Sequence, residues 1–145
     1  MSIKVGIIGI AGVGKTQFID KLEGKKCYSY LPTFDTVIRM FRYSENKNIE
    51  FRDFSGIQYY KTDDEYFNNL DVLLLMVDNR HISYINGKKM ANELLKKYSF
   101  RKVMIVQNKT DGIDKDKIIP KAHKISVNNN TGITELMKKI ISCDP

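Results

Sequence analysis

The chain has 145 residues, of which 42% are hydrophobic, and it contains only two cysteines, Cys27 and Cys143. This composition excludes a disordered chain and a disulfide-stapled one, so we expect one domain over residues 1–145 that buries its own core. The net charge of +7 comes from scattered lysines rather than one basic tract, which indicates an ordinary solvated surface more than a specific nucleic-acid site.

Apolar runs alternate with helical patterns along the chain, which is typical of a mainly parallel sheet covered by helices on both faces. The expected strands are 3–10, 36–43, 49–54, 72–77, 103–106 and 123–126, and the expected helices are 15–22, 86–98 and 133–141. A polar turn over 45–48 indicates a hairpin, so the sheet should be mixed. The apolar run 72–77 is too short to span a bilayer, and no targeting segment is recognisable.

The run from Gly9 to Thr16 reads G-I-A-G-V-G-K-T and lies between an expected strand and an expected helix. This pattern predicts a phosphate-binding loop, because its glycines let successive backbone N–H groups turn toward phosphate oxygens at a helix N-terminus. Lys15 would lie between the outer phosphates, and the Thr16 hydroxyl would bind Mg²⁺, which prefers oxygen ligands. The residues of this segment expected to bind the nucleotide are Ala11, Gly12, Val13, Gly14, Lys15, Thr16 and Gln17.

The run Asn108-Lys109-Thr110-Asp111 directly follows an expected buried strand. The Asp111 carboxylate can accept two parallel hydrogen bonds from the N1–H and the exocyclic amine of guanine, whereas adenine lacks this donor pair. Because an unpaired buried carboxylate is costly, Asp111 should select guanine. Asn108 can tie this loop to the base and to the phosphate loop, and the stem of Lys109 can lie over the ring. After a phosphate loop, N-K-x-D predicts a guanine-nucleotide site.

With these motifs, the chain resembles the Ras superfamily of small GTPases over nearly its whole length. The resemblance implies a three-layer α/β P-loop G domain with a mixed, mainly parallel six-stranded sheet, and it implies GTP or GDP with Mg²⁺ as ligands. The run D-F-S-G from Asp53 to Gly56 is similar to the family's D-x-x-G motif. By that likeness Asp53 would hold Mg²⁺ through a water, and the Gly56 N–H would sense the terminal phosphate.

The resemblance extends to both switch regions and to the base. The run L-P-T that ends at Thr33 is similar to the first switch, where Thr33 would bind Mg²⁺ only with GTP. Tyr30 matches the tyrosine that closes over the phosphates, and either Tyr28 or Cys27 lies where the family places an aromatic beside the base. A loop similar to the family's S-A-K loop, in which the central backbone N–H would meet the guanine oxygen, comprises Ser126, Val127 and Asn128.

The chain departs from the family pattern at three places. Ile57 follows Gly56 where the family usually has the glutamine that orients the attacking water, and isoleucine cannot hydrogen-bond. Gln58 lies one residue later and could serve only if the loop were re-registered. Ala11 replaces a frequent glycine, and its methyl could crowd an incoming arginine finger. The stretch 112–124 contains Pro120 and is short, so the helix expected after N-K-x-D should be shortened or absent.

Two functions from different classes are consistent with these residues. The first is a switch that binds GTP and Mg²⁺ and hydrolyses GTP slowly, with Lys15, Thr33, Gly56 and Gln58 as the candidate catalytic groups. The second is a GTP-locked module that engages effectors or regulators without turnover, which Ile57 favours. We expect a cytoplasmic monomer with no lipid anchor and no specific nucleic-acid partner. Net charge alone supports a third reading, a G protein that rides on RNA or a membrane.

Overall fold

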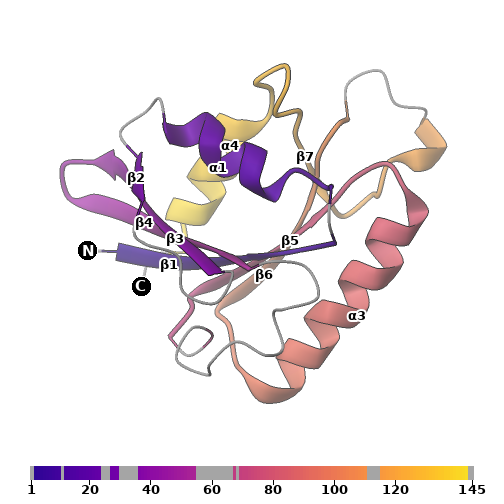
Figure 1. The fold of residues 1–145 in the computed structure, drawn as a ribbon, viewed down its shortest axis with the longest axis horizontal. Coiled ribbons are helices and arrows are strands. Elements are labelled where there is room, and N and C mark those ends of the chain that lie inside the picture. The colour runs from indigo at the N-terminus through magenta and orange to yellow at the C-terminus, as the bar shows by residue number, and fades with distance from the viewer. Residues whose placement is uncertain are drawn as a thin grey trace.

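The computed structural model describes residues 2–10, 12–23, 27–29, 36–54, 67, 69–110 and 115–143. Its strands are β1 (Ser2–Ile8), β2 (Cys27–Ser29), β3 (Thr36–Ser44), β4 (Lys47–Phe54), β5 (Val72–Val77), β6 (Lys102–Gln107) and β7 (His123–Lys124). Its helices are α1 (Lys15–Glu23), α3 (His81–Lys97), α4 (Ile133–Ile141) and the 3₁₀ turn η2 (Lys115–Lys117). Figure 1 shows these elements in one molecule.

The described strands form one sheet in the order β2-β3-β4-β1-β5-β6-β7. The four pairs from β4 through β1, β5 and β6 to β7 are parallel. The hairpin β3–β4 and the edge pair β2–β3 are antiparallel, which makes the sheet mixed as expected. Because the central strands are parallel, their carboxyl ends lie at one edge of the sheet, where ligands bind in folds of this kind.

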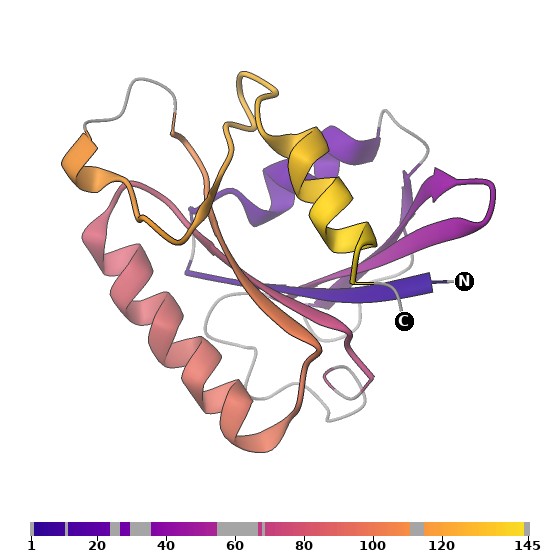
Figure 2. The same cartoon turned by 180° about the vertical axis from the view of Figure 1, so that it is seen from behind.

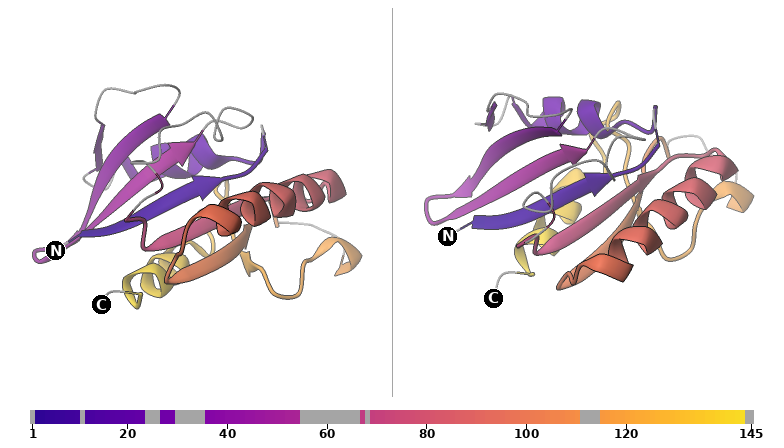
Figure 3. Two further views of the ribbon diagram at one scale, coloured as in Figure 1. Left: turned by 90° about the horizontal axis from the view of Figure 1, so that it is seen from below. Right: turned by 60° about the horizontal axis from the view of Figure 1, so that its bottom comes forward.

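Helices cover both faces of the sheet. Figure 1 shows α1 and α4 side by side over one face, and Figures 2 and 3 show α3 against the other. Strand β5 illustrates how the sequence produces two cores, because its side chains alternate with period two. Leu74 and Met76 join the core under α1 and α4, whereas Leu73 and Leu75 join the core under α3. Both faces are buried, so the strand is apolar throughout.

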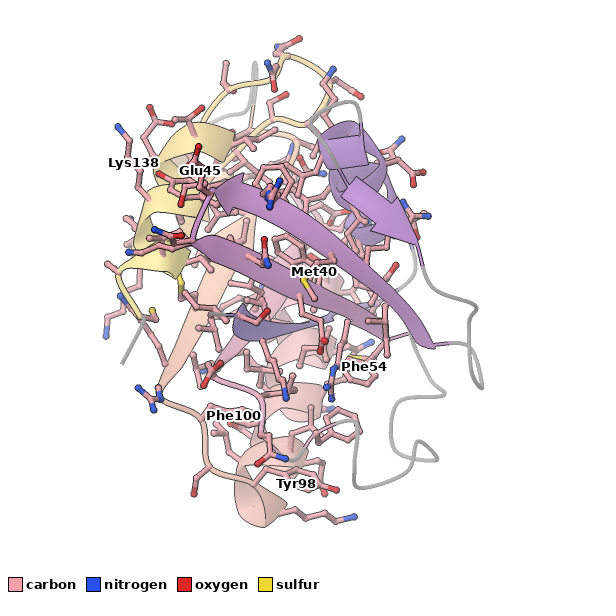
Figure 4. All side chains as sticks on the ribbon, turned by 90° about the vertical axis from the view of Figure 1, so that its left-hand side faces the viewer. Met40, Glu45, Phe54, Tyr98, Phe100 and Lys138 are labelled. Atoms are coloured by element: carbon pink, nitrogen blue, oxygen red, sulfur yellow. The ribbon has the colours of Figure 1, made fainter. Side chains whose placement is uncertain are left out.

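The core under α3 contains a stack of aromatic rings. The rings of Phe54 and Phe67 are 4.4 Å apart, and those of Phe67 and Tyr98 are 5.3 Å apart, at centroid separations typical of stacked pairs. Figure 4 shows Phe54 on the hairpin, with Tyr98 and Phe100 lying beyond the end of α3. This stack joins the end of β4, where the D-x-x-G run begins, to Tyr98 at the C-terminal end of α3.

The sheet has one strand more than the six expected. Strand β2 adds three residues to the edge through pairs such as Tyr28 with Met40. Helix α3 begins at His81 rather than at the expected residue 86. Its first turns bury the small residues Ser83 and Gly87, which give little apolar periodicity, so the sequence pattern does not mark the start of the helix. A Cβ at Gly87 would clash with the Leu75 side chain, so a small residue is what lets the helix approach the sheet.

The segment after N-K-x-D is shortened, as expected. In its described part, the only helical turn is the three-residue η2. The buried side chain of Gln107 fixes this segment: its Nε2 donates to Lys117 O at 2.8 Å, and its Oε1 accepts from the N–H of Ile119 at 2.9 Å. Among the described helices, none combines the length and the apolarity that crossing a bilayer requires.

Candidate nucleotide-binding site

Three parallel strands end at the same edge of the sheet, and the polar residues that follow them meet there. The loop after β1 leads into α1 and contains Gly9, Gly12 and Gly14, with φ values of 152°, 84° and 106°. A backbone with positive φ turns its N–H groups in directions that side-chain-bearing residues rarely allow. Thr16 and Gln17 follow in the first turn of α1, and both are exposed to solvent. The described part of this loop, which we call the cradle, is therefore suited to holding an anion at the N-terminus of α1.

Lys15 lies folded over this cradle. Its Nζ donates to Gly9 O at 2.7 Å and to Ile10 O at 3.2 Å, and the residue is only 8% exposed. Burial lowers the pKa of Lys15, and the nearby Asp53 carboxylate opposes this shift. A buried ammonium that lacks a full counter-charge would be stabilised in its charged form by an anion in the loop.

Thr16 and Asp53 form an oxygen pair beside Lys15. The Thr16 hydroxyl donates to Asp53 Oδ2 at 3.2 Å, which joins the first turn of α1 to the end of β4. Burial raises the pKa of Asp53, while Lys15 and the Thr16 hydrogen bond lower it to a smaller extent. A desolvated carboxylate next to a hydroxyl fits a hard divalent cation, which would supply the missing positive charge. The residues present therefore suit Mg²⁺.

Asn108 joins three segments of the chain. Its Nδ2 donates to Val13 O at 3.0 Å in the phosphate loop, and its Oδ1 accepts from the Val127 N–H at 3.1 Å. Its own backbone N–H donates to Val77 O at 2.8 Å. The side chain is buried, so these bonds are shielded from water. The tie between the two loops that the sequence suggests is therefore present.

The loop after β7 contains the run Ser126–Asn128, and its hydrogen bonds are made within the protein. Ser126 and Thr131 exchange two backbone hydrogen bonds, at 3.0 and 3.1 Å. The Val127 N–H, expected to meet the guanine oxygen, donates to Asn108 in this structure, so a bond to guanine would compete with that contact. Asn128 is exposed at the tip of the turn.

The sequence did not single out two residues that the structure brings to the phosphate loop, Asp78 and Arg80. Both follow β5, and the Arg80 guanidinium lies next to Gly12. A polar D-N-R run directly after an entirely apolar strand is the signal that could have drawn attention to them. Lys109 reaches the same place, because its Nζ donates to Gly12 O at 2.8 Å.

Several residues expected in the site lie outside the described part of the chain. For Tyr28 the backbone is described in β2, but the side chain is not. The expected site residues that fall outside are Ala11, Tyr30, Thr33, Gly56, Ile57, Gln58 and Asp111. Their roles toward nucleotide and Mg²⁺ stay predictions.

Comparisons with known proteins agree with this geometry. Era of Aquifex aeolicus, a point variant bound to GDP·AlF₄⁻, superposes with a TM-score of 0.74 at 22% identity. The match covers 99% of this chain and 57% of the Era chain, so this chain spans little more than half of that protein. The G domain of the iron transporter FeoB of T. maritima matches with a TM-score of 0.74, 22% identity and 99% of both chains.

These solved structures share the fold, which confirms the expected α/β class with helices on both faces of a mixed, mainly parallel sheet. No curated protein matched the chain in sequence. A family model, that of the ADP-ribosylation factor family, matches residues 1–144. The chain therefore belongs to the ADP-ribosylation factor family of GTP-binding GTPases, within the Ras superfamily.

Proposed function

We propose that this protein is a molecular switch that binds GTP or GDP with Mg²⁺ and hydrolyses GTP slowly. One contact carries the proposal: Asn108 Nδ2 donates to Val13 O at 3.0 Å and so joins the N-K-x-D loop to the phosphate loop. This bond sets a loop suited to reading guanine beside a loop suited to holding phosphates. A single nucleoside di- or triphosphate needs both at this spacing.

The chain's own groups would bind and neutralise the phosphates. Backbone N–H groups of the loop would donate to the phosphate oxygens, and the Lys15 ammonium would exchange its carbonyl partners for the outer phosphates. Thr16, Asp53 and, in the GTP form, Thr33 would hold Mg²⁺, which supplies positive charge next to the phosphate oxygens. Phosphoryl transfer depends mainly on such positioning and charge, with Thr33, Gly56 and Gln58 as the groups nearest the attacking water.

The second candidate function is a GTP-locked module that binds effectors or regulators and does not turn over. Ile57 favours it, because this side chain has no hydrogen-bonding atom with which to orient water. In that case the phosphate loop and Asp111 would still hold GTP tightly. The two candidates differ only in hydrolysis, so the rate of a single turnover of bound GTP separates them.

Guanine selectivity tests the proposal directly. Asp111→Asn should weaken GTP binding and shift preference toward xanthine nucleotides, because the amide reverses one hydrogen-bond direction. Asp116→Asn is the matched control, since Asp116 is an exposed carboxylate in the adjacent η2 turn. Calorimetry with GTP, ATP and XTP would measure the three affinities. Equal binding of GTP and ATP by the parent protein would refute the guanine assignment.

The remaining expectations are proposals of the same kind. We propose that residues 1–145 act as one monomeric domain in the cytoplasm, with the switch regions near Thr33 and Gly56 as the surface for effector or regulatory proteins. Net charge alone would give at most weak, salt-sensitive contact with acidic membranes. Retention on acidic but not neutral vesicles, abolished by salt, would agree with this; salt-resistant binding to neutral vesicles would contradict it.

A further inference from the structure

Asp78 is a buried carboxylate that holds an arginine at the edge of the phosphate loop. It follows β5 directly and is only 3% exposed. The Arg80 side chain grips it through Nε, at 3.1 Å from Oδ1 and 2.9 Å from Oδ2, and through Nη2, at 2.8 Å from Oδ2. The Arg80 backbone N–H adds a fourth bond to Oδ1 at 3.0 Å. A planar guanidinium held at several points has little freedom to move away.

The guanidinium is held against Gly12. A Cβ atom placed on Gly12 would lie 3.5 Å from Arg80 Nη2 and 3.9 Å from Nη1, so the charged end of the arginine reaches the backbone of the loop. Lys109 approaches the same residue, with its Nζ 2.8 Å from Gly12 O and 3.8 Å from Asp78 Oδ2. Among the described residues, two cations therefore converge on Gly12 around one carboxylate, and these three side chains together carry a net positive charge.

Capping of α3 does not account for this arrangement. Arg80 occupies the N-cap position of α3, where the helix dipole favours a negative charge and disfavours a positive one. Asp78 alone would satisfy that preference. The pKa of Asp78 is lowered: burial would raise it, but the bonds from Arg80 and Ser83 outweigh burial, so the carboxylate stays ionised at neutral pH. The helix thus explains Asp78 but not the arginine.

We propose that Arg80 is a phosphate-binding residue of this site, whose guanidinium, fixed by Asp78 over Gly12, adds positive charge to the outer edge of the phosphate loop. The proposal rests on the proposed function, because it requires a nucleotide in the loop. Arg80 is thus a cation that the chain itself contributes beside the phosphate loop. Its effect should grow with the number of phosphates, since each adds negative charge near Gly12.

Comparing nucleotides that carry one, two or three phosphates tests this inference. The affinities of the parent and of Arg80→Ala for GMP, GDP and GTP with Mg²⁺ would be measured by calorimetry. Arg80 is half exposed, so we expect a loss of about threefold to fivefold for GTP, a smaller loss for GDP and less than about twofold for GMP. Arg80→Lys keeps the charge but loses the multi-point contact with Asp78, so it should restore only part of the GTP affinity that Arg80→Ala loses. The parent's affinity should also fall more steeply with added salt than the variant's.

Arg101→Ala is the matched control. Arg101 is 51% exposed and pairs with Asp71, with its Nε 3.6 Å from Oδ1, so the change in charge, the exposure of the arginine and the residue types of the pair are matched. Asp71 precedes β5 and Asp78 follows it, so this pair lies at the opposite end of a six-residue strand, about 20 Å away. The control variant should bind GMP, GDP and GTP with the same affinities as the parent.

The outcomes are distinguishable. If the parent binds none of the guanine nucleotides, the proposed function fails. If the parent binds GTP and Arg80→Ala binds all three nucleotides as the parent does, Arg80 does not serve the phosphates. An equal loss for GMP, GDP and GTP would overturn the inference as well, because it would mean that Arg80 supports the loops without acting on phosphate charge. A melting temperature measured for each variant shows that the folded protein is being compared.

Discussion

The side chain of Asn108 donates a hydrogen bond to the carbonyl oxygen of Val13, a residue 95 positions earlier in the chain. The Oδ1 atom of Asn108 accepts a hydrogen bond from the Val127 N–H, so one side-chain amide holds the phosphate loop, the N-K-x-D loop and the loop before α4 together. Asn108→Ala would leave the Val13 carbonyl and the Val127 N–H without this partner. We expect a loss of about 1–3 kcal/mol of stability and weaker GDP binding, checked by thermal unfolding and by titration with fluorescent GDP.

Asn92→Ala is the control for this prediction, because Asn92 is exposed on α3 and belongs to none of the three loops. It should change neither the melting temperature nor the affinity, within error. A parent-like melting temperature for Asn108→Ala would contradict the role of the buried amide.

Gly14 provides a second test of the same junction. Its φ is +106°, and a Cβ at this position would clash with Asn108 Nδ2. Gly14→Ala should therefore both strain the loop and displace the Asn108 side chain. We expect this change to weaken GDP binding by more than about tenfold and to lower the melting temperature. The double variant Gly14→Ala/Asn108→Ala should be less destabilised than the sum of the single changes, because both act on one contact. Full additivity would argue that they act independently.

Asp53→Asn should separate stability from metal binding. Burial raises the pKa of Asp53, so its ionised form costs stability in the folded protein without nucleotide. Because the pKa of Asp53 is higher in the folded than in the unfolded protein, the free energy of unfolding decreases as the pH rises through this folded pKa. We expect the nucleotide-free variant to melt about 2–4 °C higher than the parent at pH 7, and no differently near pH 3, where both side chains are neutral. The Mg²⁺ dependence of GDP binding should decrease.

The opposite sign is expected for Asp78→Asn. Hydrogen bonds from Arg80 and Ser83 outweigh burial and lower the pKa of Asp78, so its ionised form stabilises the fold above the unfolded pKa. The variant should lose about 1.5–3 kcal/mol at pH 7, and the difference should vanish as the pH falls through the folded pKa. Urea unfolding at a series of pH values measures both carboxylates. If the two variants shifted stability in the same direction at pH 7, the assigned environments would be wrong.

The sequence predicted most of the fold because its strongest patterns are local. Helix α4 and strand β5 have the predicted bounds, since one is strongly amphipathic and the other is apolar throughout. The start of α3 was placed too late, because Ser83 and Gly87 give its buried face little apolar periodicity. Strand β2 is only three residues long, and only its pairing with β3 makes it a strand. Both misses depend on tertiary contacts.

The candidate site divides in the same way. Lys15, Thr16 and Asn108 belong to sequence motifs with a fixed spacing, and the expected tie between Asn108 and the phosphate loop is present. The roles of Lys15 and Thr16 toward phosphate and Mg²⁺ stay predictions. Arg80 belongs to no motif, and its place beside Gly12 depends on where β5 ends and on the Asp78 carboxylate. The polar D-N-R run after β5 could mark Arg80 as a candidate, but its contact with Gly12 becomes visible only in the folded structure.

Hydrolysis decides between a slow switch and a locked module. Ile57 stands where a polar side chain would orient the attacking water, while Lys15, Thr16 and Asp53 remain for binding. Intrinsic turnover should therefore be slow in the parent and faster in Ile57→Gln. An arginine finger raises the rate of GTP hydrolysis by on the order of 10³–10⁵-fold in such enzymes, and its effect depends on a correctly held water. Ile57→Gln alone should therefore reach only part of the rate that an enzyme with both groups attains.

Single-turnover hydrolysis with Mg²⁺ would compare the parent, Ile57→Gln and Gln58→Ala, each first shown to bind GTP. A fast parent that Gln58→Ala inactivates would mean that the loop is re-registered and that Gln58 orients the water. Equal inertness of the parent and Ile57→Gln would favour the locked module, because restoring the usual side chain would then restore nothing. A slow parent with a faster Ile57→Gln is the result expected of a switch that lacks only the group that positions water.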